Sequence, residues 1–242
     1  MTEGRPAVLI LGSGPNAVTA ATWPKAWFDE IVVINNAWRV RDDWDVIVFP
    51  EDFPPDRRPP RFSAEQRSVE ADAFVPAQNA FGGFVFAGAT MAYTAAYWVL
   101  AARAPAVMAF MGCDMMYPKT GPTHFYGTGA PDPLRDDVSL RDLAAKSARL
   151  ALLAAGEDCA CVNLSSDPSS LLFPRCPPDC LRAARPCAAD HTAVAKLRAK
   201  EDALGYVTPD GRYDPTGACM DIAALDALDS GWRTLFAQTA PA

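Results

Sequence analysis

Three features of the chain have residue types suited to chemistry: a glycine-rich turn at residues 12–17, Asp114 after a later strand, and His124 in an aromatic loop. Backbone N–H groups at a turn that opens a helix point outward together, and with the helix dipole they favour a phosphate. Histidine titrates near neutral pH and is the side chain used most often for general acid–base work. Together these features predict a site that binds an anion and moves a proton.

The glycine-rich turn follows a short aliphatic run at residues 8–11, which predicts a buried parallel strand. The residues expected to face a phosphate are Gly12, Ser13, Gly14, Pro15 and Asn16. Their spacing fits G-x-G-x-x-A, but a dinucleotide site also needs an acidic residue about 20 positions later. Asn35 and Asn36 stand there instead, which weakens the dinucleotide interpretation. The alternative is a βα turn that binds nothing.

The elements that position these residues alternate between near-continuous apolar strands and helices, which is typical of a parallel sheet. Strands are expected at 8–11, 31–34, 45–49, 106–111 and 160–164, and helices at 89–103 and, after Ser139 as N-cap, at 140–155. We predict a single Rossmann-like α/β domain over residues 1–175, with a mostly parallel sheet and helices on both faces. Residues 176–242 are expected to form a Cys- and Pro-containing linker and a small appendage with helices at 192–204 and 222–238.

The topology predicts which residues meet. In open α/β sheets, ligands bind at the carboxyl ends of the strands, so Asn36, Asp114 and the glycine turn are expected at one edge. His124 lies in the loop after Asp114 and is expected at the same edge, where it could act as a general base beside the bound ligand. A lone histidine is more often structural, and that alternative stays open.

Residues 50–79 interrupt the α/β pattern with pairs of prolines and arginines. Such prolines do not fit a central strand or a helix interior, so we predict a surface excursion with a short helix near 64–71. The arginines of 57–61 either belong to a solvated basic loop or contribute charge to an anionic ligand.

A second cluster of reactive residues lies near the C-terminal end: Cys176, Cys180, Cys187 and His191. Thiolates and an imidazole are zinc ligands, but the spacing lacks the C-x2-C pairing of common zinc sites. A loop in which the cysteines have no joint role is the other interpretation.

Composition narrows the classes of function. Half of the 242 residues are hydrophobic and the net charge is -7, which is typical of a folded domain and argues against binding to nucleic acid. The apolar runs fall short of the roughly 18 residues of a membrane span, and the start of the chain shows no leader pattern. The seven scattered cysteines do not resemble a secreted disulfide framework. We expect a cytoplasmic protein. The sequence does not determine its oligomeric state, and a homo-oligomer is one possibility.

Several short motifs follow one another in a distinctive order over about residues 7–173. They are GSGPN at 12–16, INN at 34–36, a helix opened by Gly88-Ala89-Thr90, GCD at 112–114, HFYG at 124–127, and Asn163 with PSSLL at 168–172. This order resembles the bacterial sialyltransferases of glycosyltransferase family 42. It is also similar to related families grouped with archaeal 6-hydroxymethylpterin diphosphokinases.

The resemblance implies roles for these positions. In the sialyltransferases a G-N-G-P-S loop and an asparagine after the second strand hold CMP, and a histidine in S-H-Y-x-G is the general base, which corresponds to His124. A lid tyrosine assists the departing phosphate, for which Tyr117 is the nearest counterpart. Hydroxyl donors replace a metal ion in that family. The resemblance implies nucleotide contacts at Gly12, Ser13, Gly14, Pro15, Asn16, Asn36, Gly88, Thr90, Ser169 and Ser170, and a catalytic role for Asp114.

Three hypotheses follow. The first is a metal-independent transferase that moves a sugar from a CMP-linked donor to an unknown acceptor, with no further cofactor. The second is a diphosphokinase-type phosphoryl transfer from ATP, with Mg²⁺ held by carboxylates such as Asp114. The third is a nucleotide-binding scaffold without turnover, because Ser13 replaces the family's asparagine and the arginine before its central helix has no counterpart at 84–90. The region of the family's acceptor-binding insertion is also shorter here.

Overall fold

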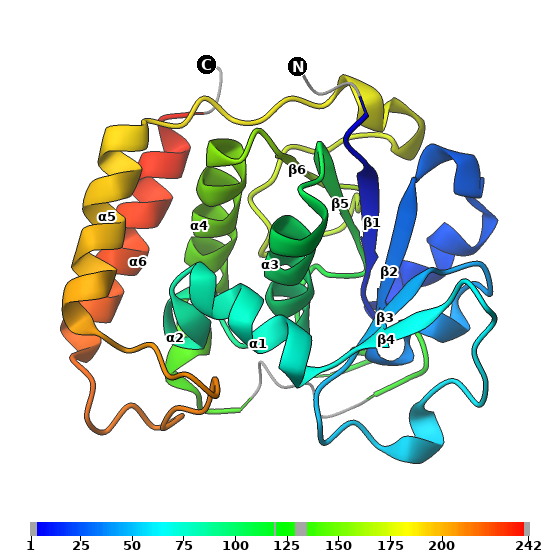
Figure 1. The fold of residues 1–242 in the computed structure, drawn as a ribbon, viewed down its shortest axis with the longest axis horizontal. Coiled ribbons are helices and arrows are strands. Elements are labelled where there is room, and N and C mark those ends of the chain that lie inside the picture. Colours follow the sequence, from blue (N-terminus) through cyan, green and yellow to red (C-terminus); the bar gives the residue numbers. More distant parts are fainter. Residues whose placement is uncertain (1–3, 119, 129–134, 240–242) are drawn as a thin grey trace.

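The fold is built on a six-stranded, all-parallel sheet, in a computed structural model that describes residues 4–118, 120–128 and 135–239. The strand order is β4-β3-β2-β1-β5-β6. The strands are β1 (Ala7–Leu11), β2 (Glu30–Ile34), β3 (Val46–Val48), β4 (Arg67–Val69), β5 (Val107–Met111) and β6 (Ala160–Asn163). The predicted α/β class with a parallel sheet is therefore confirmed, and the molecule is consistent with a single Rossmann-like domain (Figure 1).

Strand β1 lies in the interior of the sheet, between β2 and β5. Leu9 stands opposite Ile31 on one side and Ala109 on the other, and all five β1 residues are buried. From β1 the chain first builds outward through β2, β3 and β4, and then returns to add β5 and β6 on the other side. This reversal is the topological switch point where ligands of open α/β sheets bind. The glycine-rich turn follows β1 at that point.

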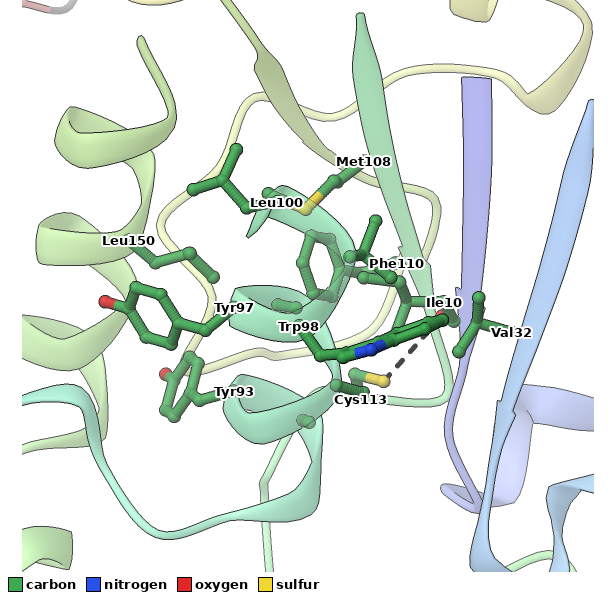
Figure 2. Close-up of a cluster of buried hydrophobic side chains, with 14 of the residues drawn as sticks. Ile10, Val32, Tyr93, Tyr97, Trp98, Leu100, Met108, Phe110, Cys113 and Leu150 are labelled. Atoms are coloured by element: carbon green, nitrogen blue, oxygen red, sulfur yellow. Dashed lines mark hydrogen bonds between the residues drawn. The ribbon is translucent and has the colours of Figure 1, made fainter. Parts of the chain in front are cut away.

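One face of the sheet is covered by α-helices. These are α1 (Ala71–Ala80), α3 (Met91–Arg103) and α4 (Leu143–Gly156), and the short α2 (Gly83–Ala87) packs against all three. Figure 2 shows Trp98 of α3 extending toward Ile10 and Val32 of the sheet, while Tyr97 points toward α4. Because α3 is buried along nearly its whole length, it packs between the sheet and α4, as its apolar sequence predicts.

Two helix starts differ slightly from the prediction. Thr90 is the N-cap of α3, and its hydroxyl accepts the Tyr93 N–H at 3.3 Å. The N-cap of α4 is Asp142 and not Ser139, because the Asp142 carboxylate accepts the Ala145 N–H at 2.9 Å. Ser139 instead belongs to a short 3-10 helix, η6 (Val138–Leu140). The polar side chain closest to the first turn sets the start of each helix.

The opposite face is covered by short 3-10 helices. They are η1 (Pro15–Thr22), η2 (Lys25–Trp27), η3 (Asn35–Arg39) and η7 (Pro178–Ala183). Ala17 and Ala20 of η1 and Leu181 of η7 are buried against this face. Helices thus lie on both faces, and the helix predicted after the glycine-rich turn takes the tighter 3-10 form.

Residues 50–80 contain more regular structure than predicted. A 3-10 turn, η4 (Pro55–Arg57), is followed by the edge strand β4 and then by α1. The helix predicted near 64–71 is wrong, because β4 occupies part of that range and α1 begins only at Ala71. Only Val69 of β4 is buried, and Pro76 lies inside α1. An edge strand with one buried residue and a helix containing proline leave a weak sequence pattern.

The two helices predicted in the C-terminal segment are confirmed as α5 (His191–Leu204) and α6 (Ile222–Ala237). Both lie beside α4, at the end of the molecule away from β4 (Figure 1). Trp232 of α6 is 1% exposed and packs with Leu152 of α4. The segment therefore shares a core with the sheet domain.

Two buried ion pairs join the C-terminal helices to α4. The Arg149 guanidinium binds Glu201 at 2.7 Å, and the Lys146 ammonium binds Asp229 at 2.7 Å. Side chains in both pairs are at most 8% exposed. Removing one member of such a pair leaves an uncompensated charge inside the protein. Among the helices in the described part of the chain, none has the length and apolar character needed to cross a membrane.

Candidate functional site

A cleft of about 800 Å³ opens at the carboxyl ends of β1, β2 and β5. This volume falls within the usual range for small-molecule sites. The predicted residues that line it are Gly12, Ser13, Gly14, Pro15, Asn36, Thr90, Asp114, Tyr117 and His124. The fold therefore brings most of the candidate site to one place.

Two other hollows have less to offer a ligand. One of about 660 Å³ lies beside α6, next to the N-cap of α4, and one of about 740 Å³ lies near Glu30 and Arg103. Several of their charged side chains already bind one another, as Arg141 binds Asp226 and Arg103 binds Glu30, each at 2.8 Å.

The glycines of the turn allow two strand ends to touch. The Gly14 N–H donates to the Gly112 carbonyl at 2.8 Å, and the Gly12 N–H donates to the Met111 carbonyl at 2.8 Å. A Cβ atom on Gly12 would lie 2.4 Å from the Gly112 oxygen, and one on Gly112, whose φ is +67°, would lie 2.7 Å from the Cβ of Ala17. Backbone packing alone thus requires glycine at 12 and 112.

The same turn keeps two N–H groups for a ligand. Within the described residues, the backbone N–H groups of Ser13 and Asn16 have no hydrogen-bond acceptor. Gly14, the N-cap of η1, provides no side chain that could cap the helix. The uncapped start of η1 therefore offers donors and a positive dipole end to an anion.

Asn35 and Asn36, which follow β2, present buried oxygen atoms without partners. The Oδ1 atoms of both residues have no hydrogen-bond partner among the residues that the structure describes. Asn36 is 3% exposed, and Asn35 adopts a left-handed backbone conformation with φ at +50°. An unpaired buried acceptor is costly, and a hydroxyl or amino group of a ligand in the cleft would satisfy it.

Asp114 is held in place by amides. Its carboxylate accepts Asn16 Nδ2 at 2.7 Å and Asn163 Nδ2 at 3.4 Å. Asn16 Nδ2 also lies 2.9 Å from a carboxylate oxygen of Asp167 and 2.8 Å from the Ser165 hydroxyl. Asn16 thus joins two carboxylates through its side chain, and it is not itself among the residues that line the cleft.

Three other predicted contact residues are not among those that line the cleft. The Ser169 hydroxyl accepts Asn163 Nδ2 at 3.0 Å, and the Ser170 N–H donates to the Asp114 carbonyl at 2.8 Å, so both brace the β5 and β6 ends. Gly88 ends α2 with φ at +86°. A Cβ there would lie 2.9 Å from Tyr93. The structure gives these residues supporting positions because their groups already have partners in the protein.

His124 lines the cleft from a short turn. Its Nδ1 is 2.9 Å from the Thr123 hydroxyl, and its ring stacks on Tyr126 with centroids 4.9 Å apart. The Phe125 N–H donates to the Ser13 carbonyl at 3.0 Å, which ties this turn to the glycine-rich turn. If Nδ1 carries the ring proton and donates a hydrogen bond to the Thr123 hydroxyl, Nε2 is the unprotonated, basic nitrogen. Lys119 and Gly129 of the predicted aromatic loop lie outside the described residues.

Partial burial lowers the pKa of His124 below its usual value, because water solvates the imidazolium less well there. We therefore expect its NMR titration midpoint below about 6.5. The pKa of His124 is lower in the folded protein than in the unfolded chain. The neutral ring therefore makes its full contribution to the free energy of unfolding above about pH 6.5, and this contribution is lost as the pH falls through the pKa of the folded state. His124→Ala identifies the signal, and a midpoint at or above about 6.5 would contradict the assigned environment.

Sequence reasoning missed some of the cleft residues. Arg39, at the end of η3, had no motif to indicate it, and Tyr126 was noted only as a member of the HFYG motif. Arg57 belongs to the arginine-rich segment for which an anionic ligand was one interpretation, and it lines the cleft. Its neighbour Arg58 has a structural role, because its guanidinium donates to the Phe53 carbonyl at 3.0 Å.

The cysteines have no evident place in this chemistry. Cys113 lines the cleft, but burial raises the pKa of its thiol far above the usual range. Across residues 4–118, 120–128 and 135–239, no group of three His, Cys, Asp or Glu side chains is placed to hold a metal ion. Cys176, Cys180 and Cys187 are free thiols in this structure.

Comparison of the chain with known protein families, curated proteins and solved structures finds no match in any of the three. We therefore infer function from the geometry of the cleft.

Proposed function

We propose that the cleft binds a CMP-linked sugar and that the protein transfers the sugar to an acceptor, with His124 as general base and without a metal ion. The observation that supports this most is that His124 lines the same cleft as the uncapped start of η1 and the unpaired oxygens of Asn35 and Asn36. A base, an anion site and a set of hydroxyl acceptors are what such a reaction requires.

In the proposed reaction, Nε2 of His124 takes the proton of the acceptor hydroxyl. The acceptor oxygen forms a bond to the anomeric carbon of the sugar as the bond from that carbon to the phosphate oxygen breaks. CMP leaves with the bonding electron pair. The N–H groups of Ser13 and Asn16 stabilise the charge that develops on the phosphate, and Tyr117, which also lines the cleft, adds a hydroxyl donor.

The ribose of the nucleotide fits the end of the cleft near β2. Its two hydroxyl groups would donate to the Oδ1 atoms of Asn35 and Asn36, which lack partners within the described residues. In dinucleotide sites an acidic residue in this position accepts the same hydroxyls. Carboxamides accept them without adding a negative charge close to the phosphate.

A second candidate is phosphoryl transfer from ATP with Mg²⁺. The observation that favours it is the approach of Asp114 and Asp167 to one amide nitrogen of Asn16, at 2.7 and 2.9 Å. Two carboxylates at the strand ends are suitable ligands for Mg²⁺, which binds to oxygen and is shared with substrate phosphates.

Calorimetric titration with CMP, CDP, ADP and ATP, first with EDTA and then with Mg²⁺, tests both candidates. We expect CMP and CDP to bind in EDTA, and Asn36→Ala to weaken that binding about tenfold or more, because one hydrogen bond to a buried acceptor is lost. Asn79→Ala is the matched control, since Asn79 also has a buried Oδ1 without a partner in the described chain but lies on α1, outside the cleft lining.

The outcomes separate the candidates. Binding of ATP only with Mg²⁺ would contradict the CMP-sugar proposal and support phosphoryl transfer. Binding of CMP without any turnover of donor sugars would leave a scaffold that recognises nucleotides. An equal loss of affinity in Asn36→Ala and Asn79→Ala would show that the cleft assignment is wrong.

A further inference from the structure

The cleft continues past the glycine-rich turn toward η3 and η4, where two arginines line it. Arg39 is the last residue of η3, and Arg57 is the last residue of η4. They come from separate segments, after β2 and after β3. Their guanidinium groups add positive charge at the end of the cleft away from Asp114.

Neither guanidinium has a charged partner in the described part of the chain. The side chain of Arg39 lies 5.3 Å from the ring centroid of Trp38, and Arg57 uses only its backbone in the hydrogen bonds found for it. Other arginines nearby are occupied: Arg41, for example, binds Asp43 at 2.6 Å. Asp52 and Asp56 also line this end but form no ion pair with either arginine.

Trp38 holds the two segments together. Its indole N–H donates to the Arg57 carbonyl at 2.9 Å, and its ring faces the Arg39 guanidinium. The position of η4 relative to η3 therefore depends on Trp38 and on the backbone of Arg57. Because the Arg57 side chain makes no part of this contact, it is available to a ligand.

We infer that Arg39 and Arg57 form a subsite for a second anionic group of the ligand, a phosphate or a carboxylate, beyond the phosphate at the glycine-rich turn. This inference rests on the proposed nucleotide site. Guanidinium groups bind phosphate and carboxylate oxygens through paired, charge-assisted hydrogen bonds. A ligand that spans both ends of the cleft would be a nucleoside diphosphate or a nucleotide-linked acidic sugar.

Calorimetric titrations with matched ligands test the subsite and identify the anion. If the second group is a phosphate, CDP binds more tightly than CMP. If it is a carboxylate, a CMP-linked acidic sugar binds more tightly than a CMP-linked neutral sugar. In either case Arg57→Ala and Arg39→Ala weaken the tighter ligand about tenfold or more, and change CMP binding by less than about twofold.

Arg61→Ala is the matched control, because Arg61 is an exposed arginine of the same segment that does not line the cleft. Equal affinity for the members of both ligand pairs would overturn the subsite. The subsite would also be overturned if the arginine substitutions weakened CMP binding as much as binding of the longer ligand. In that case the arginines would bind the phosphate of CMP itself.

Inorganic pyrophosphate separates failure of this inference from failure of the proposed function. If the unsubstituted protein binds no nucleotide, the proposed function is contradicted. Pyrophosphate binding that Arg57→Ala abolishes and Arg61→Ala preserves would still support an anion subsite. If neither nucleotides nor pyrophosphate bind, both proposals are overturned.

Discussion

Replacing Glu201 with alanine is expected to lower the free energy of unfolding by about 3–5 kcal/mol, because it leaves the Arg149 guanidinium buried without a counter-charge. Glu201 accepts Arg149 Nε at 2.8 Å and Nη2 at 2.7 Å, and it also accepts the Trp232 indole N–H at 2.9 Å. Arg149 is 0% exposed, so water cannot replace these contacts. Urea unfolding followed by circular dichroism measures the change.

Asp226→Ala provides the control for Glu201→Ala. Asp226, on α6, also binds an arginine, but its side chain is 52% exposed and that of its partner Arg141 is 41% exposed. Surface pairs contribute only about 0–1 kcal/mol, so Asp226→Ala should unfold at nearly the same urea concentration as the unsubstituted protein. Equal destabilisation by the two substitutions would show that the buried pair is not the link between α5 and α4.

His124→Ala is expected to slow the proposed sugar transfer by about 10²–10⁴-fold once a donor and an acceptor are known, because the proposed general base is removed. Nucleotide affinity should change little, since the proposed phosphate and ribose contacts come from Ser13, Asn16 and the two asparagines after β2. The measurement is turnover with the donor identified by titration. A loss of nucleotide binding equal to the loss of turnover would contradict the assignment of His124 as base.

His191→Ala is the control for that experiment. His191 is the second histidine of the chain and is exposed at the first turn of α5. Its substitution removes the same chemical group outside the cleft lining, so turnover should be retained. Full turnover in His124→Ala would show that another group accepts the proton.

Much of the fold follows from short-range patterns in the sequence. Strands β1 and β5 are continuous apolar runs that are buried throughout, and β2 is apolar and buried from Ile31 onward. Such runs predict parallel strands because both of their faces are covered. Strand β4 and α1 give no such pattern, since β4 buries only Val69 and α1 keeps Pro76 within a helix that is packed against α3. Tertiary packing, and not the local sequence pattern, determines that these two elements form.

The candidate site was predictable where topology decides it. Asn36 and Asp114 each follow a parallel strand, so they lie at the same edge of the sheet regardless of the conformation of the loops. The segments that carry Arg39 and Arg57 are joined by the hydrogen bond from Trp38 to the Arg57 carbonyl, 19 residues away, which no local pattern indicates. The buried Glu201 was also missed, because charged residues are usually exposed unless a partner is known.

The contact between the glycine-rich turn and Gly112 also bears on how the motif should be interpreted in a mutational scan. A side chain at Gly12 would meet the Gly112 carbonyl at 2.4 Å, so intolerance of substitution there reports on folding whether or not a ligand binds. Ser13 and Pro15 line the cleft, and nothing in this contact requires their side chains. In such a scan, the effect of substitutions on ligand binding should therefore be sought at Ser13 and Pro15.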